Sequence, residues 1–361
     1  MTNEVPPIYF YIPKKRFPKA DLPENPENYW QWQISQGLDN SGDYGWTLQT
    51  YLYLKSGGLR CELTTSLPDE GIVLSHRPLL SDKVQPTGKL LIICVQGDRK
   101  RHPYAQLHVV QNPLQQVPKG LFKLWESCFI PYWPQPGLIP RDPTGGDRFE
   151  NVTFFGREQN LIHELRQPLW HETLEDLGLR WQICSSADRW NDYSEADVVV
   201  AVRKFGYSWD HTWKPANKLY NAWLAGVPAI LGLESAYQAE RKSELDYLEV
   251  ASYQQLISAI KRLKGDRELR RAMTENARVR AEEIGPLKLV KRWEDFLKNI
   301  AVPAYESWCE TSEAERQRFF QARSLAYKFY FSQRHLRFIK AKIDFKLQGR
   351  KLVGQQLKRD L

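Results

Sequence analysis

At 361 residues, 42% of them hydrophobic, the chain is longer than one hydrophobic core usually supports, and we expect two domains. A net charge of +8 and a pI near 9.1 favour an anionic partner, which includes nucleotides, nucleic acids and anionic membrane surfaces. Five scattered cysteines without a C-x-x-C pair exclude a disulfide framework. With no apolar run of transmembrane length and no leader-like N-terminus, these features predict a cytoplasmic protein.

Short apolar runs alternate with helical patterns in the first half of the chain, which predicts an α/β fold with parallel sheets. Strands are predicted at residues 8–12, 59–64, 72–75, 90–95 and 106–110. A helix is predicted over residues 44–56, with Asp43 as its N-cap and Gly57 and Gly58 as its stop. The proline- and glycine-rich residues 131–146 break regular structure, and we predict the interdomain linker there.

The second half repeats the pattern of strands and helices, as a second Rossmann-like domain would. Strands are predicted at residues 152–155, 180–184, 197–202 and 229–231, and helices at 158–177, from 217, and as an amphipathic pair over 252–299. Pro303 is expected to break the chain. The tail over residues 305–361 is aromatic and basic, and its pattern predicts a helix.

Residues 213–232, WKPANKLYNAWLAGVPAILG, have the pattern of an anion-binding site. A basic loop with Lys214 leads into a short helix with Lys218 in its first turn, where unpaired backbone N–H groups and the helix dipole favour a phosphate. Leu219 and Trp223 fall on one helical face, which can pack on a sheet. An ordinary helix-to-strand connection with two solvated lysines explains the spacing equally well.

The same region resembles a known family. The residues that carry the resemblance are Lys214-Pro215, Asn217-Lys218-Leu219, Asn221-Ala222-Trp223, the run AGVPAILG at 225–232 and ESAY at 234–237. They are similar to the nucleotide-sugar site of GT-B glycosyltransferases of the family 4 and family 1 type, above all to cyanobacterial exopolysaccharide enzymes, including glucosyltransferases of heterocyst envelope polysaccharide. The resemblance covers about residues 150 to 300.

The resemblance implies a GT-B fold, in which two Rossmann-like domains face each other across a cleft and C-terminal helices cross back to the first domain. We expect an acceptor-side domain at 1–140, a nucleotide-sugar domain at 147–302 and a helical tail at 303–361. Many relatives carry two glutamates eight positions apart around the motif helix. Here Trp213 and Asn221 stand at those places, and the Asn221 amide can still hydrogen-bond a ribose hydroxyl.

Donor-binding residues are predicted from the motif and from the ends of neighbouring strands, which open onto one crevice in an open α/β sheet. They are Gly42, Gly45, Arg157, Arg203, Lys214, Asn217, Lys218, Leu219, Asn221, Glu234 and Ser235. A surface arginine at 157 and a plain turn at residues 37–45 are the simpler alternatives. Arg189 and Trp190 follow another strand and are candidates for the nucleobase, although a core or interdomain contact explains Trp190 as well.

Catalytic roles are predicted for Asp98, His102, Arg157 and Lys218. Asp98 and His102 follow the strand at 90–95 and have the chemistry to bind or deprotonate an acceptor hydroxyl, unless they belong to a solvated basic loop. Arg157 and Lys218 would stabilise the charge that grows on a leaving nucleoside diphosphate. No metal-binding pattern is visible, so no metal and no cofactor are expected, and basic side chains would neutralise the diphosphate.

The prediction is therefore a metal-independent glycosyltransferase that transfers glucose from UDP-glucose to a polysaccharide or lipid-linked acceptor. The resemblance implies retention of anomeric configuration. The expected partners are the nucleotide-sugar donor, the saccharide acceptor and an anionic membrane touched at its cytoplasmic face, with no nucleic acid. A nucleotide-sugar epimerase of the same fold, and a non-enzymatic protein that binds nucleic acid or membranes through its basic tail, are the alternatives.

Overall fold

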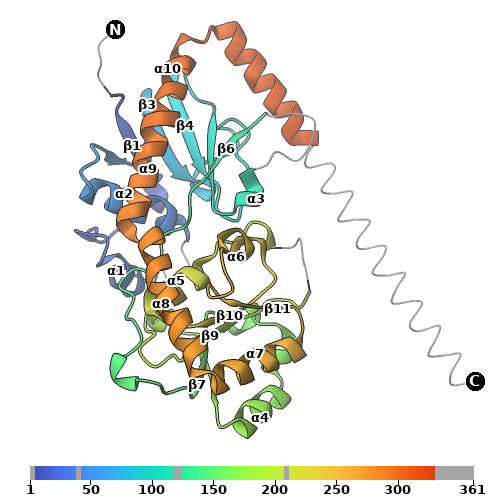
Figure 1. Ribbon diagram of the computed structural model, residues 1–361. Helices are drawn as coiled ribbons and strands as arrows, with labels where there is room; N and C mark the ends of the chain where they lie inside the picture. The colour runs from blue at the N-terminus through green and yellow to red at the C-terminus, as the bar shows by residue number, and fades with distance from the viewer. Residues whose placement is uncertain (1–4, 38–41, 117–123, 207–210, 330–361) are drawn as a thin grey trace, which may run out of the picture.

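The structure, a computed structural model, describes residues 5–37, 42–116, 124–206 and 211–329. These residues form two α/β domains, each built around one parallel sheet (Figure 1). The chain completes the first sheet before it begins the second, and long helices then lead it back to the first. The exact limits of the domains remain those predicted from the sequence.

The first sheet has six strands in the order β2-β1-β3-β4-β5-β6. They are β1 (Ile8–Tyr11), β2 (Glu62–Thr64), β3 (Glu70–His76), β4 (Lys89–Val95), β5 (Leu107–Val110) and β6 (Glu126–Phe129). The central pair, β3 and β4, is parallel over seven residues, from Glu70 opposite Lys89 to His76 opposite Val95. Both strands are almost wholly buried, which explains their continuous apolar sequence. Helices α1 (Tyr29–Ser35), α2 (Gly42–Ser56) and α3 (Pro113–Gln116) accompany this sheet.

The second sheet has five parallel strands in the order β11-β10-β9-β7-β8. They are β7 (Asn151–Phe155), β8 (Arg180–Cys184), β9 (Val198–Ala201), β10 (Ala229–Gly232) and β11 (Leu248–Val250). Its helices are α4 (Pro168–Asp176), α5 (Asn217–Ala225), α6 (Ser235–Glu240), α7 (Tyr253–Gly265) and α8 (Arg267–Ile284). Because β8 and β9 lie on opposite sides of β7, the strand order reverses between β7 and β9, where open α/β sheets bind ligands.

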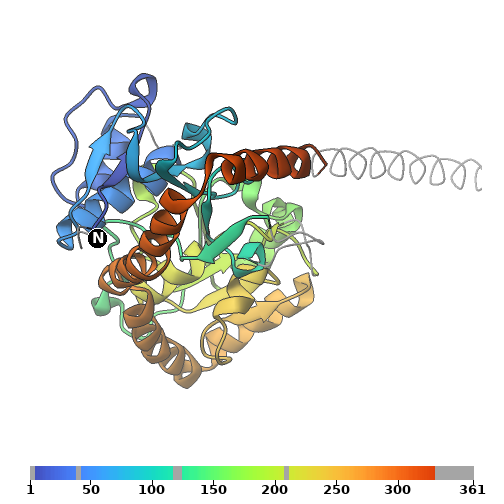
Figure 2. The ribbon, with the colours of Figure 1, turned by 90° about the horizontal axis from the view of Figure 1, so that it is seen from above.

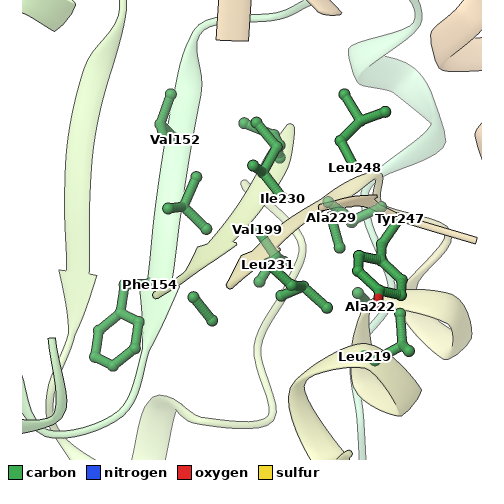
Figure 3. Packing of buried hydrophobic residues seen from close by; sticks show 14 of the residues in the cluster. Val152, Phe154, Val199, Leu219, Ala222, Ala229, Ile230, Leu231, Tyr247 and Leu248 are labelled. Atoms are coloured by element: carbon green, nitrogen blue, oxygen red, sulfur yellow. The ribbon is translucent and has the colours of Figure 1, made fainter. Parts of the chain in front are cut away.

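The core of the second domain fixes α5 against its sheet. Figure 3 shows Leu219 and Ala222 of α5 near Leu231 of β10 and Tyr247, which directly precedes β11, and all four are buried. The chain leaves the carboxyl end of β9, passes through α5 and enters the parallel strand β10. The first turn of α5 therefore stands at the carboxyl edge of the sheet, and the helix ends at Gly226, whose φ is 68°.

The last helices cross back to the first domain, as the GT-B resemblance implies. Helix α8 is followed by α9 (Pro286–Phe296), a π-helical turn (Leu297–Ala301) and α10 (Val302–Glu310), which Figures 1 and 2 show running from the second domain to the first. Leu289 and Trp293 of α9 are fully buried in the core of the first sheet. Residues 313–329 form a further helix. Among the described residues, no helix is long and apolar enough to cross a membrane.

Two predicted elements are wrong, and prolines explain both. The helix predicted over 158–177 is instead two short 3-10 turns followed by α4, which begins at Pro168, because proline disfavours helical geometry in the residue before it and leaves Gln167 extended. Pro303 does not break the chain. It stands in the first turn of α10, directly after the π-helical turn at Leu297–Ala301, and the chain is helical on both sides of it.

Other boundaries differ in smaller ways. The pair of helices predicted over 252–299 is three helices, because the Asp266 side chain accepts the Leu269 N–H at 2.9 Å and starts α8, while Pro286 starts α9. Helix α2 begins at Gly42, so Asp43 lies inside it rather than at its N-cap. Strands β6 and β11 and helix α1 were not predicted. Residues 38–41 of the glycine-rich loop lie outside the described residues.

Candidate functional site

A pocket of about 500 Å³ lies between the two domains. It is lined by Tyr29, Trp30, Gln33, Gly42, Gln49, Tyr132, Trp133, Pro134, Gln135, Pro136, Phe155, Gly156, Arg157, Gln159, Asn160, Trp190, Tyr193, Asn217, Lys218 and Asn221. These residues come from α1, α2 and the segment before β7 on one side, and from the carboxyl end of β7 and the start of α5 on the other. The lining holds two cationic side chains, Arg157 and Lys218, and among the described residues no aspartate or glutamate.

Lys218 is the central charged group of this pocket. Its ammonium group donates to the carbonyl oxygen of Phe155 and lies 4.6 Å from the centre of the Phe154 ring. Burial lowers the pKa of Lys218 to about 7, and the nearby positive charge of Arg203 lowers it further, against the opposing pull of Glu234. An anion bound in the pocket would reverse this shift, because it would compensate the buried charge.

Gly156 makes room for Lys218 at the end of β7. Its φ is 137°, a backbone conformation that other residues rarely adopt, and a Cβ atom there would lie 3.0 Å from the Lys218 ammonium nitrogen. Arg157 follows directly and lines the pocket. The Phe155-Gly156-Arg157 turn therefore brings Lys218 and Arg157 to the same pocket, at the point where the strand order reverses.

Several buried polar atoms around the pocket have no hydrogen-bond partner within the protein. They are Tyr29 Oη, Trp30 Nε1, Gln135 Nε2 and Asn217 Oδ1. Buried polar groups are almost always hydrogen-bonded, since an unmade bond costs about 1–3 kcal/mol. Each of these atoms has almost no accessible surface, so a molecule in the cavity reaches them only if neighbouring side chains move.

Five of the predicted site residues meet at this pocket: Gly42, Arg157, Asn217, Lys218 and Asn221. Asn221 is already engaged, because its side-chain oxygen accepts the Gln135 N–H at 3.0 Å. The Asn217 amide donates to the Trp133 carbonyl at 3.4 Å. These two bonds connect α5 to the segment before β7, and they fix the two sides of the pocket relative to each other.

Arg203 and Glu234 form a buried ion pair next to Lys218, outside the pocket lining. Ser235 lies at the contact between the domains, where its hydroxyl accepts the Asn112 amide at 2.9 Å. Leu219 is fully buried in the core, so only its backbone is available for a ligand.

Asp98 and Lys214 pair with each other across the domains, with 3.4 Å between the Lys214 ammonium and the Asp98 carboxylate. The backbone of the loop before α5 is held by the first domain, because the Gln111 amide donates to the Trp213 carbonyl at 2.8 Å and the Asn112 amide to the Lys214 carbonyl at 3.0 Å. This ion pair lies outside the pocket lining.

His102 is fully buried and does not line the pocket. Its Nδ1 accepts the Ala105 N–H at 3.0 Å, so its Nε2 carries the proton and donates to the Ser81 carbonyl at 2.9 Å. Burial lowers the pKa of His102 to about 4. Both ring nitrogens therefore hold the loop together by hydrogen bonds.

Gly45, another predicted site residue, is not in the pocket lining. It allows close packing, since a Cβ atom there would collide with the Tyr132 hydroxyl.

The aromatic side of the pocket was missed by the sequence analysis. Tyr29-Trp30 and Tyr132-Trp133 are both Tyr-Trp pairs close to glutamines, but neither pair has a spacing that points to a ligand, and the second falls in the predicted linker. Trp190, a candidate for the nucleobase, stacks on Trp30 of the other domain with ring centres 6.2 Å apart, so it is an interdomain contact.

No group of three or more potential metal-ligating side chains occurs within the described ranges. No model of a known protein family matches the chain, and no curated protein matches it.

Solved structures resemble the fold. A structure of Anabaena HepE in complex with UDP-glucose is 11% identical, with 82% of this chain and 100% of that chain covered and a TM-score of 0.47. The pneumococcal O-GlcNAc transferase GtfA in complex with UDP and GlcNAc is 14% identical over 70% of this chain and 60% of its own length, with a TM-score of 0.46. Sucrose-phosphate synthase from Thermosynechococcus elongatus is 13% identical over 64% and 74%, with a TM-score of 0.44. Similarity of this degree identifies neither a substrate nor a reaction for this chain.

Proposed function

We propose that this protein is a glycosyltransferase that uses a nucleotide-sugar donor. The observation that carries the proposal is the pocket at the reversal of strand order, where Lys218 and Arg157 face a cavity without a carboxylate among its described residues. Two cations and the first turn of α5 suit a diphosphate. Positive groups held in place before the reaction stabilise the charge that develops on the leaving diphosphate as the bond to the sugar breaks.

The finer points of the reaction are also proposals. The motif resemblance over residues 214–237 supports UDP-glucose as the donor. The described pocket offers no carboxylate or histidine as a nucleophile or base. A retaining reaction in which a donor phosphate oxygen takes the acceptor proton requires neither group.

A divalent cation would also find no carboxylate ligand in the described lining of the pocket. We therefore expect transferase activity to be undiminished in excess EDTA. A loss of activity in EDTA that Mg²⁺ or Mn²⁺ restores would contradict this.

The acceptor is proposed to be a polysaccharide or a lipid-linked oligosaccharide. The basic tail supports a location at the inner face of an anionic membrane, because positive side chains next to apolar ones bind such surfaces. This part of the proposal is independent of the donor site.

Calorimetric titration with UDP, GDP, UDP-glucose and UDP-galactose tests the function. One nucleotide family should bind, and Lys218→Ala should weaken its affinity at least tenfold, while Lys89→Ala, an exposed lysine at the amino end of β4, should leave it unchanged. Failure of all four ligands to bind would refute a transferase. Isomerisation of the sugar nucleotide without an acceptor would identify an epimerase instead.

A further inference from the structure

Helix α5 is joined by two asparagines to residues 132–136, which precede β7 and which we name the linker segment. Asn217 and Asn221 are four positions apart, so they lie on the same face of the helix. The Asn217 amide donates to the Trp133 carbonyl at 3.4 Å, and the Asn221 oxygen accepts the Gln135 N–H at 3.0 Å. Alternate residues of the linker segment are therefore bonded to successive turns of α5.

The Gln135 N–H is a donor that the local sequence makes scarce. Residues 134–136 read Pro-Gln-Pro, and proline has no backbone N–H. Proline also disfavours helical geometry in the residue before it, which favours an extended segment. This stretch of three residues therefore has a single N–H group to donate, and Asn221 accepts it.

The Asn221 side chain has a second partner on the side of its own domain. Asn221 is 8% exposed. Burial raises the pKa of Tyr193, and a hydrogen bond with the Asn221 side chain lowers it in part. The Tyr193 ring stacks on Phe155 with ring centres 3.8 Å apart, and the Phe155 carbonyl accepts a hydrogen bond from the Lys218 ammonium group. Asn221 therefore connects the linker segment to the residues that hold Lys218 in place.

The linker segment is held on its other side by the first domain. The Trp133 indole donates to the Thr50 hydroxyl of α2 at 2.9 Å, and the Trp133 ring stacks on Tyr53 with ring centres 4.2 Å apart. The linker segment and Lys218 line the same pocket. Loss of the bond at Asn221 would therefore leave this part of the lining tied to α2 and less well fixed to α5.

We propose that Asn221 is a positioning residue of the donor site, which holds the linker segment against α5, and that it does not bind the ribose of the donor. The inference rests on the proposed function, because it concerns the pocket assigned there to the nucleotide sugar. It replaces the ribose contact expected from the sequence. An amide suits this role, because its oxygen accepts the Gln135 N–H while its nitrogen can still donate to a second partner.

The first test compares Asn221→Ala with Asn276→Ala by calorimetric titration of the full chain with UDP. Asn276 is an asparagine of α8 outside the pocket lining, and its amide donates to the Asp246 carboxylate at 3.0 Å. Each variant loses a side-chain hydrogen bond, so both should melt at a lower temperature. Asn221→Ala should also weaken UDP binding about tenfold, whereas Asn276→Ala should leave it unchanged. Unchanged UDP affinity in Asn221→Ala would make Asn221 a merely structural residue and overturn the proposal.

Substitution of Gln135 tests whether Asn221 acts through the linker segment. Gln135→Pro removes the N–H that Asn221 accepts, and Gln135→Ala, which keeps this N–H and loses the same side chain, is its reference. Gln135→Pro should bind UDP several-fold more weakly than Gln135→Ala. Added to Gln135→Pro, Asn221→Ala should weaken binding by no more than about threefold, against about tenfold when added to Gln135→Ala, because the bond between the two residues is already lost.

Two outcomes of this comparison would overturn the proposal. Equal effects of Asn221→Ala in the two backgrounds would show that Asn221 does not act through the Gln135 N–H. Equal UDP affinities of Gln135→Pro and Gln135→Ala would show the same without any change at Asn221, so the test does not depend on the folding of the Asn221 variant.

Nucleotides that lack one ribose hydroxyl separate positioning from direct contact. Asn221→Ala should weaken the binding of UDP, 2′-deoxy-UDP and 3′-deoxy-UDP by the same factor, because the residue acts through the protein. If the wild type prefers UDP and Asn221→Ala removes that preference, Asn221 binds the ribose and the proposal is wrong. Failure of the wild type to bind any nucleotide would instead refute the proposed function, and the inference with it.

Discussion

Lys218 lies in the lining of the pocket, close to the charges of Arg203 and Glu234, and this is the residue whose titration reports on function. Its pKa of about 7 means that half of the molecules carry no charge there near neutral pH. A bound diphosphate would stabilise the charged form and raise this pKa. Binding and protonation are therefore coupled.

Nucleotide affinity should consequently depend on pH. Below pH 7 Lys218 is already charged and affinity should be constant. Above it, each pH unit should weaken UDP binding by about tenfold until the pKa of the bound state is reached, and calorimetry in buffers of different ionisation enthalpy should detect proton uptake. The Lys218→Arg variant keeps its charge and should bind with little dependence on pH. The same steep dependence in Lys218→Arg would exclude Lys218 as its source.

The same residue should make the free protein less stable. Because the pKa of Lys218 is about 7 when folded and 10.5 in a model peptide, the unfolded chain binds more protons between these values, and stability should rise with pH across this window. Lys218→Met removes the penalty of burying the charge, so it should raise the melting temperature at about pH 6 and change it little near pH 10. Lys89→Met, an exposed control, should show no such difference. Thermal unfolding of the wild type and both variants at the two pH values measures these melting temperatures.

At the scale of the element, α9 is the helix that joins the two domains. It follows α8 after the extended Gly285 and buries Leu289, Trp293 and Phe296 in the core of the first sheet. The π-helical turn after it widens the helix just before Pro303, and the chain goes on as α10. The core of the first domain is thus completed by residues more than one hundred and fifty positions beyond its last strand, β6.

Truncation of α9 should therefore destabilise the first domain. Trp293 is fully buried, and Trp293→Ala should cost about 3–5 kcal/mol of unfolding free energy through lost burial and a cavity. Leu287 lies on the same helix and is 87% exposed, so Leu287→Ala should stay within about 0.5 kcal/mol. Urea unfolding of the wild type and both variants measures the two changes in unfolding free energy. Equal losses would mean that α9 does not pack as described.

At the scale of the whole molecule, charge is concentrated at one end. Residues 325–361 contain ten Lys or Arg and two Asp or Glu, so this stretch alone accounts for the net charge of +8. Its described beginning is anchored, because the Tyr327 hydroxyl donates to the Asp82 carboxylate at 2.8 Å. On the same helix Leu325 and Phe329 are 68% and 64% exposed. Exposed apolar side chains beside a basic stretch suit an anionic membrane surface.

Deletion of the residues after His335 removes eight of these ten basic residues. Binding to vesicles that contain phosphatidylglycerol should fall more than tenfold, because each cation near such a surface contributes about 1 kcal/mol and several are removed together. UDP affinity should not change, since the donor site lies elsewhere. Vesicles of phosphatidylcholine alone are the control and should bind neither form. Undiminished binding of the truncated chain to anionic vesicles would refute a role for the tail.

Much of the fold could be predicted from the sequence, because its signals are local. The strands at 72–75, 90–95 and 180–184 are apolar or alternating runs that the structure confirms, and the stop of α5 at Gly226 follows from glycine's tolerance of positive φ. Predictions failed where a local pattern met a proline. Helical periodicity over 158–177 was real, but Pro168 decided where a helix could begin.

The candidate site divides in the same way. Sequence determined its charged side, since Asn217 and Lys218 occupy one helical turn and Arg157 follows a strand after a single glycine. Only the tertiary structure decided that Asp98 and Lys214 pair with each other and that His102 is sealed in its loop. The aromatic side of the pocket likewise exists only in the folded chain. Residues 29–49 and 132–136 are far apart in sequence, and no periodicity encodes the packing that brings them around one cavity.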